Sequence, residues 1–102
     1  PFLGVRYVPV SADLVEKEKL GRDYGVFIIG GPNEPGVVTG SPAAKAGLKE
    51  RDIILAINGE KVDQDHPLAS IIQKYQVDQE VTLKVFRDGK EFEVKVKLEE
   101  RK

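Results

Sequence analysis

The sequence contains no cysteine, which excludes a disulfide framework, a thiolate nucleophile and a cysteine metal site. Cysteine usage therefore fits a reducing compartment and an oxidising one equally well. The chain also lacks an excess of either charge, because 16 basic and 17 acidic side chains give a net charge of −1. No broad electrostatic field exists to attract nucleic acid or an anionic membrane, so we expect neither as a partner.

Long apolar segments are absent as well. No run approaches the roughly 20 residues needed to span a bilayer, and the chain carries no basic, apolar, cleavable leader. The chain begins with Pro1 and contains no methionine, so we expect an excised domain or a processed product. Its 102 residues suit one domain with a single modest core.

Groups that could perform catalysis or hold a metal are few. The candidate hydroxyl nucleophiles are Ser11, Ser41 and Ser70. None lies in a nucleophile-elbow pattern and His66 is the sole imidazole base, so we expect no catalytic site in this chain. His66 and scattered carboxylates such as Asp63 and Asp65 lack metal-ligand spacing, and Gly30-Gly31 leads to Pro32 and not to a phosphate-binding turn. We therefore expect no metal and no cofactor.

The hydrophobic pattern predicts an α+β domain that is mostly β. Alternating or continuous apolar runs predict short strands at 4–8, 24–29, 37–38, 53–57, 81–85 and 92–98. Helices are expected at 12–20 after Ser11 as N-cap, from Pro42 through a run of alanines, and at 67–75. Asn58-Gly59 and the Asp88-Gly89 region predict tight hairpin turns, and 30–36 is dense in loop residues.

Residues 41–59 are the most informative stretch of the chain. The small-residue run Ser-Pro-Ala-Ala-Lys-Ala-Gly-Leu leads into a predicted buried strand and a tight turn. Together with Phe2-Leu3-Gly4-Val5 at the start, this order resembles a PDZ domain, and more narrowly the bacterial PDZ domains appended to HtrA-family serine proteases. The resemblance implies a small, partly open β-barrel or sandwich of five to six strands with two to three helices, in the bacterial (permuted) topology. It implies a single domain over 1–98 and a charged tail over 99–102.

The resemblance also implies a loop that binds a peptide carboxylate. Phe2-Leu3-Gly4-Val5 matches the Gly-Leu-Gly-Phe loop of PDZ domains, so the backbone amides of Leu3, Gly4 and Val5 would be the donors. Consecutive N–H groups in a tight loop concentrate partial positive charge, and glycine lets the backbone fold that closely. The loop is therefore expected to hold the terminal carboxylate of a peptide ligand.

The rest of the implied site is an edge strand and a helix. The strand residues expected to pair with the incoming peptide are Val5, Arg6 and Tyr7. The helix side chains expected to line the hydrophobic groove are Leu68, Ile72 and Tyr75. Ile71 points about a hundred degrees away from its neighbour, so it is the better core candidate. An apolar pocket of this kind predicts ligands with hydrophobic C-terminal residues.

Three positions differ from the family pattern. Arg51 stands where glycine is frequent before Asp52, and Val77-Asp78 replaces a frequent Pro-Gly. If those turns still need positive φ, each non-glycine residue costs about 1–2 kcal/mol. His66 precedes Pro67 and comes about one turn too early to contact a ligand hydroxyl, so we expect it to cap the helix or to face solvent.

We therefore expect a module that captures hydrophobic C-termini of misfolded or other substrate proteins by β-augmentation. The module would deliver these substrates to the protease domain of the same parent chain, or regulate that domain. The parent would be an HtrA-like serine endopeptidase of the bacterial cell envelope, periplasmic or membrane-anchored. Two alternatives stay open. The domain could belong to a carboxyl-terminal processing peptidase or an intramembrane metalloprotease, or it could be a self-association module without a free peptide ligand.

Overall fold

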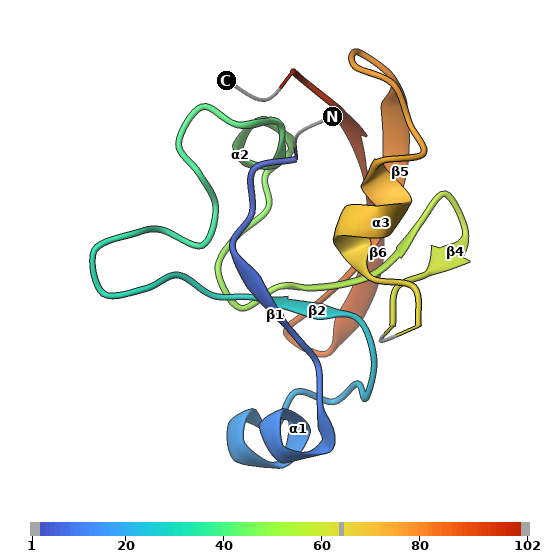
Figure 1. The fold of residues 1–102 in the computed structure, drawn as a ribbon. Coiled ribbons are helices and arrows are strands. Elements are labelled where there is room, and N and C mark those ends of the chain that lie inside the picture. The colour runs from blue at the N-terminus through green and yellow to red at the C-terminus, as the bar shows by residue number, and fades with distance from the viewer. Residues whose placement is uncertain (1–2, 64, 101–102) are drawn as a thin grey trace.

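The computed structural model describes residues 3–63 and 65–100, and within them six strands form one antiparallel sheet accompanied by three helices (Figure 1). The strands are β1 (Tyr7–Pro9), β2 (Val26–Ile28), β3 (Ile53–Ile57), β4 (Glu60–Lys61), β5 (Glu80–Arg87) and β6 (Lys90–Lys97). The helices are α1 (Ala12–Glu18), α2 (Pro42–Ala46) and α3 (Leu68–Ile72). The strand order is β1-β2-β3-β5-β6, with β4 paired to β3. The sheet path has two ends, so the predicted partly open fold is confirmed.

Local signals explain where the first two helices begin and end. Ser11 and Ser41 are the N-caps of α1 and α2, and each hydroxyl accepts a hydrogen bond from the backbone N–H three residues later. Pro42 occupies the first turn of α2, where its missing N–H costs nothing, and Gly47 ends the helix at a φ of 90°. The predicted caps are confirmed, although α1 ends at Glu18 and not at residue 20.

Two tight turns set the register of the hairpins. Asn58 and Gly59 have φ values of 49° and 83°, and Asp88 and Gly89 have φ values of 52° and 81°. Two successive positive φ angles are the signature of the type I′ turn, whose twist matches that of the flanking strands. The predicted hairpins β3–β4 and β5–β6 are therefore confirmed.

Apolar side chains fill both faces of the sheet. The larger cluster lies on the face covered by α2 and α3, and it receives Ile28, Ile54 and Ile57. The smaller cluster lies on the α1 face and receives Phe27 and Ile53, among others. A register shift between Ile54 and Ala56 explains why Ile54 and Ile57, an odd number of residues apart, point into the same cluster.

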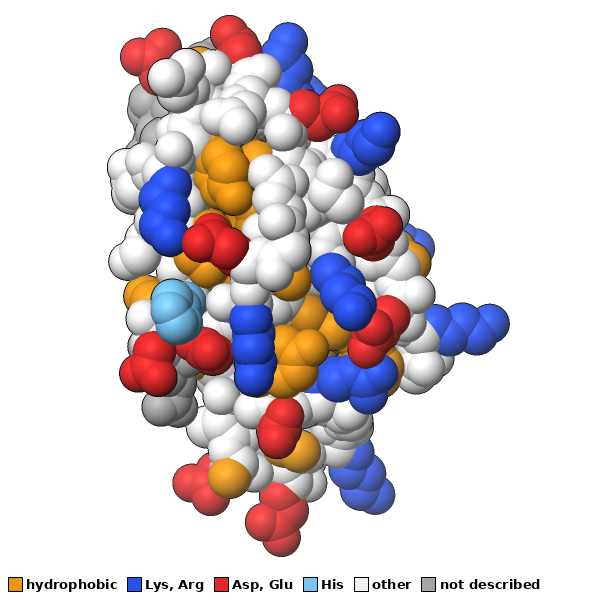
Figure 2. All heavy atoms as spheres, turned by 90° about the vertical axis from the view of Figure 1, so that its right-hand side faces the viewer, with side chains coloured by type: hydrophobic (Ala, Val, Ile, Leu, Met, Phe, Trp, Pro, Cys, Tyr) orange, Lys and Arg blue, Asp and Glu red, His pale blue; other side chains and the backbone are white. Residues whose placement is uncertain are grey.

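The outer surface mixes charges and small apolar patches. Arg22 lies 4.3 Å above the ring centre of Phe86, and Lys61 lies 4.4 Å above that of Tyr24, so cations cover aromatic rings of the smaller cluster. Figure 2 shows one face on which Lys and Arg alternate with Asp and Glu around short hydrophobic patches. The described residues include no helix long and apolar enough to cross a membrane.

The first predicted strand is wrong in its position. The sequence predicted 4–8, but β1 begins at Tyr7 and ends at Pro9. Val5 instead forms a single bridge with Val37, and Arg6 lies between the two pairings. The backbone N–H of Arg6 donates to Gly36 at 2.7 Å, whereas its carbonyl accepts from Ile29 at 3.1 Å. The chain that pairs with this segment departs from it after residue 29 and rejoins it at residue 36, so the hydrogen-bond ladder is interrupted between the pairings Tyr7–Ile28 and Val5–Val37.

The two turns that depart from the family pattern keep the backbone that glycine favours. Arg51 has a φ of 72° and Asp78 a φ of 70°. Arg51 gains contacts that offset the strain, because its guanidinium donates to Glu18 at 3.0 Å and lies 5.3 Å from the ring centre of Phe27. The condition for backbone strain, a positive φ at a non-glycine residue, is therefore met at both turns.

Candidate functional site

The segment Leu3–Val5 is shaped by backbone bonds to the start of α2. Gly4 has a φ of 91°, a conformation that side chains disfavour. The carbonyl of Leu3 accepts from the N–H of Ala43 at 2.9 Å, and the carbonyl of Gly4 accepts from Val38 at 2.8 Å. Both carbonyls therefore face the segment 38–43. Phe2, the first residue of the predicted loop, lies outside the described residues.

The direction of these carbonyls fixes the direction of two amides. A trans peptide unit is planar, so its N–H points opposite to its carbonyl. Because the carbonyls of Leu3 and Gly4 face the segment 38–43, the N–H groups of Gly4 and Val5 face away from it. Two successive donors thus point to the same side of the loop, an arrangement that can bind an anion.

The sheet offers an open edge next to this loop. β1 is the last strand of the sheet path on its side. Arg6 directs both its backbone groups inward, to Gly36 and Ile29. Backbone groups alternate along an extended chain, so those of Val5 and Tyr7 point outward, to the open edge. Pro9 has no N–H, so the edge available for pairing ends there.

The predicted groove side chains gather around the same core cluster as the loop. Leu3 (3% exposed), Leu68 (1%) and Ile72 (7%) belong to the larger cluster, and partly buried Val5, Tyr7 and Tyr75 pack against it. The described members of the predicted site, apart from Gly4 and Arg6, thus contact one core cluster. Leu68 is as buried as Ile71, so burial does not separate the expected groove residue from the expected core residue.

Helix α3 is shorter than predicted. It ends at Ile72 and not at 75, so the prediction that Tyr75 lies on the helix is wrong. The chain continues in tighter turns, in which Lys74 donates to Ile71 and Tyr75 donates to Ile72, both at 3.1 Å. Such three-residue turns keep Tyr75 on the side of Ile72, which explains its contact with the core cluster.

His66 lies in an exposed turn before α3. Its side chain is 62% exposed and its Nδ1 lies 3.0 Å from Asp63 Oδ1. The backbone N–H of His66 donates to the same oxygen at 2.8 Å. These bonds, led by the one from the imidazole, lower the pKa of the Asp63 carboxyl. The pale blue side chain in Figure 2 stands at the surface beside acidic neighbours, so the expected solvated position of His66 is confirmed.

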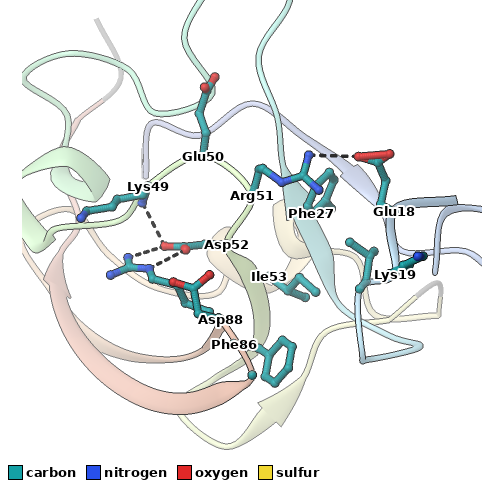
Figure 3. Close-up of a pocket in the computed structure, with 13 residues that line it drawn as sticks. Glu18, Lys19, Phe27, Lys49, Glu50, Arg51, Asp52, Ile53, Phe86 and Asp88 are labelled. Atoms are coloured by element: carbon teal, nitrogen blue, oxygen red, sulfur yellow. Dashed lines mark hydrogen bonds and ion pairs between the residues drawn. The ribbon is translucent and has the colours of Figure 1, made fainter. Parts of the chain in front are cut away.

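A pocket of about 360 Å³, which the sequence did not predict, lies on the α1 face of the sheet (Figure 3). It is lined by apolar side chains of the smaller cluster and by charged residues, among which Glu18 pairs with Arg51 and Asp52 pairs with Arg87. The lining residues are Glu18, Lys19, Leu20, Phe27, Lys49, Glu50, Arg51, Asp52, Ile53, Phe86, Arg87, Asp88 and Gly89. The Arg51–Glu18 pair closes one side at 3.0 Å. Among the described residues, no group of three or more His, Cys, Asp or Glu could hold a metal ion.

Asp52 and Arg87 form the most buried ion pair of this pocket. Asp52 is 1% exposed, and its two oxygens accept from Arg87 Nε at 2.7 Å and Nη2 at 2.5 Å. The pair raises the pKa of Arg87, chiefly through these hydrogen bonds. Asp52 also accepts from Lys49 N–H at 2.9 Å, and Arg87 donates to Gly47 at 3.0 Å. The pair therefore fastens the turn after α2 to β5.

Comparisons with known proteins agree with this geometry. Residues 1–98 match the family model described as the PDZ domain. The chain is 40% identical over 95 residues to a probable periplasmic serine endoprotease DegP-like of Chlamydia pneumoniae, covering 93% of this chain and 18% of that protein. The chain spans about a fifth of the length of such curated relatives.

Two solved structures share the fold. The HtrA-type protease AlgW with a decapeptide is 25% identical, with a TM-score of 0.79 over 99% of this chain and 29% of that one. The PDZ domain of HtrA3 bound to a phage-derived ligand, FGRWV, is 19% identical, with a TM-score of 0.72 over 94% of this chain and 82% of that one. The second likeness shows the fold alone.

Proposed function

This chain belongs to the PDZ domain family, and we propose that it captures the hydrophobic C-termini of substrate proteins by β-augmentation. One observation carries the proposal: the amides of Gly4 and Val5 face the same side, next to an open sheet edge and to a cluster that includes Leu68 and Ile72. A terminal carboxylate, an extended backbone and an apolar side chain find their partners within this small region.

Each part of the ligand has its own partner on the protein. The carboxylate accepts from the loop amides, and Leu3 N–H is the third proposed donor. Charged hydrogen bonds of this kind contribute about 1.5–3 kcal/mol each. The backbone of the ligand pairs with Val5 and Tyr7, and its last side chain packs against Leu68, Ile72 and Tyr75. Two or three such bonds and one buried side chain contribute about 5–12 kcal/mol in total, and the binding free energy is what remains after the cost of association.

The parent protein is proposed to be an HtrA-like serine endopeptidase of the bacterial periplasm. The curated relative is a DegP-like periplasmic serine endoprotease, and AlgW is an HtrA-type protease. These likenesses favour this parent over the two other protease classes considered. In the proposed role, the module binds C-termini exposed by misfolded proteins and delivers them to the protease domain of the same chain, or regulates that domain when occupied. The division into a domain at 1–98 and a tail at 99–102 stays a prediction.

The test is a calorimetric titration with matched peptides ending in Val or Phe, each as a free acid and as an amide. We expect the free acids to bind, and the amides to bind about 10- to 100-fold more weakly, the loss of one charged hydrogen bond. Ile72→Glu should abolish binding, whereas Ser70→Glu, the same charge on the exposed side of α3, should not. Equal binding of acid and amide would refute carboxylate capture, and an absence of all binding would favour the self-association alternative.

A further inference from the structure

The hydroxyl of Ser41 makes a contact that capping does not require. Ser41 is 3% exposed, and its Oγ accepts from the N–H of Ala44 at 3.2 Å, as an N-cap does. The same Oγ also lies 3.4 Å from the carbonyl oxygen of Gly4 as a donor. Ser11 caps α1 in the same way, accepting from Leu14 at 3.3 Å, and it is only half-buried.

A serine hydroxyl has one proton to donate as well as lone pairs to accept with. Capping uses a lone pair, so the proton of the buried Ser41 hydroxyl is left for another acceptor. The Gly4 carbonyl is within reach and already accepts from Val38 at 2.8 Å. Two donors therefore hold this oxygen from the side of the segment 38–41.

The Gly4 carbonyl belongs to the same rigid peptide unit as the Val5 N–H. A donor that orients the carbonyl therefore orients the amide, and hydrogen bonds in series polarise one another. The first turn of α2 contributes a second anchor. The N–H of Ala43 has no acceptor within the helix and donates instead to the Leu3 carbonyl at 2.9 Å. The start of α2 thus holds both peptide units that present the proposed donors.

We propose that Ser41 is a positioning residue of the peptide site, which aims the Val5 amide at the ligand carboxylate without contacting the ligand. This inference rests on the proposed function, since it concerns the same loop. The Oγ–oxygen distance is long for a hydroxyl donor, so we expect its effect on the peptide unit to be modest.

The experiment compares Ser41→Ala, Ser41→Thr and the control Ser11→Ala. The control removes a helix cap of the same kind at the far end of the molecule (Figure 1). Each variant is titrated with the free-acid and the amidated peptide, and the readout is the ratio of the two affinities. A fold that is merely less stable as a whole lowers both affinities together and leaves this ratio unchanged.

We expect Ser41→Ala to reduce the ratio of acid to amide affinity about 2- to 5-fold, less than the full effect of one ordinary hydrogen bond, because the contact is long. Ser41→Thr, which keeps the hydroxyl, and Ser11→Ala should keep the wild-type ratio. If Ser41→Ala folds poorly, Ser41→Gly serves instead, because glycine is tolerated at an N-cap. An unchanged ratio in the variant without the hydroxyl, or equal losses with Ala and Thr, would overturn the inference. A wild-type chain that does not distinguish acid from amide would instead refute the proposed function.

Discussion

Replacing Asp52 with asparagine should strongly destabilise the fold, because this carboxylate is buried and paired with Arg87. The substitution removes the negative charge that faces Arg87 and places an amide where two acceptor oxygens now stand. One of those oxygens also receives the N–H of Lys49. At least one of these donors would then meet an N–H₂ group, while the guanidinium keeps its charge.

The magnitude follows from the burial of the two partners. Breaking a buried ion pair costs about 3–5 kcal/mol when the remaining charge has no access to water. The Arg87 side chain is 27% exposed, so partial hydration reduces the expected loss to about 2–3 kcal/mol. For a domain of this size that loss lowers the melting temperature by roughly 10–20 °C. Arg87→Met should cost at least as much, because it leaves the 1% exposed Asp52 without its cation.

The assay is thermal and urea denaturation followed by circular dichroism, with Glu18→Gln as the matched control. That control removes the carboxylate partner of Arg51, a pair at the same pocket with 58% and 25% exposed side chains, and should cost less than about 1 kcal/mol. A loss for Asp52→Asn no larger than the loss for the control would refute the argument that burial makes this pair strong.

Three further outcomes follow from backbone and charge. Asp78→Gly should stabilise the chain by about 1 kcal/mol, measured in urea, because the residue has a φ of 70°; no gain would show that the turn is unstrained. Gly25→Ala should prevent stable folding, because the added Cβ would lie 2.5 Å from the Ile54 carbonyl oxygen; a native melting curve would contradict this. Arg22 lowers the pKa of Glu91, so the ionised carboxylate stabilises the folded state at neutral pH, and this contribution is lost as the pH falls through the lowered pKa. In Arg22→Gln, NMR titration should give a higher pKa for Glu91, and an unchanged pKa would contradict the assignment.

Signals confined to a few neighbouring residues were predicted correctly. The caps Ser11 and Ser41 and the turn at Asn58-Gly59 depend on short-range bonds and on φ angles that particular residue types favour. The apolar run over 53–57 was also informative, because β3 contributes side chains to both clusters and therefore shows no polar alternation.

Features that depend on distant partners were not predicted. The position of β1 depends on the loop 30–36, because Arg6 pairs with Ile29 before this loop through its carbonyl and with Gly36 at the loop's end through its N–H. The spacing of Leu68, Ile72 and Tyr75 predicted one helix face, and all three side chains contact the larger cluster, but periodicity does not reveal where helical hydrogen bonds give way to tighter turns.

The pocket on the α1 face had no sequence signal at all. Asp52 and Arg87 are 35 residues apart, and each is an ordinary charged residue in its own context. For the proposed peptide site, the sequence indicated the Gly4 loop, but the contacts that direct its amides come from Val38 and Ala43, which are 34 residues after Gly4 and 40 residues after Leu3. Only the folded chain brings these groups together.

Carboxylate capture by the amides of Gly4 and Val5 can be followed by backbone amide NMR during titration with a peptide ending in Val. We expect the largest shift changes at Gly4 and Val5, with Tyr7 next, and we expect the amidated peptide to leave Gly4 and Val5 nearly unchanged. Equal shifts with both peptides, or largest shifts at Lys49, Arg51 and Asp88 around the pocket on the α1 face, would contradict carboxylate capture.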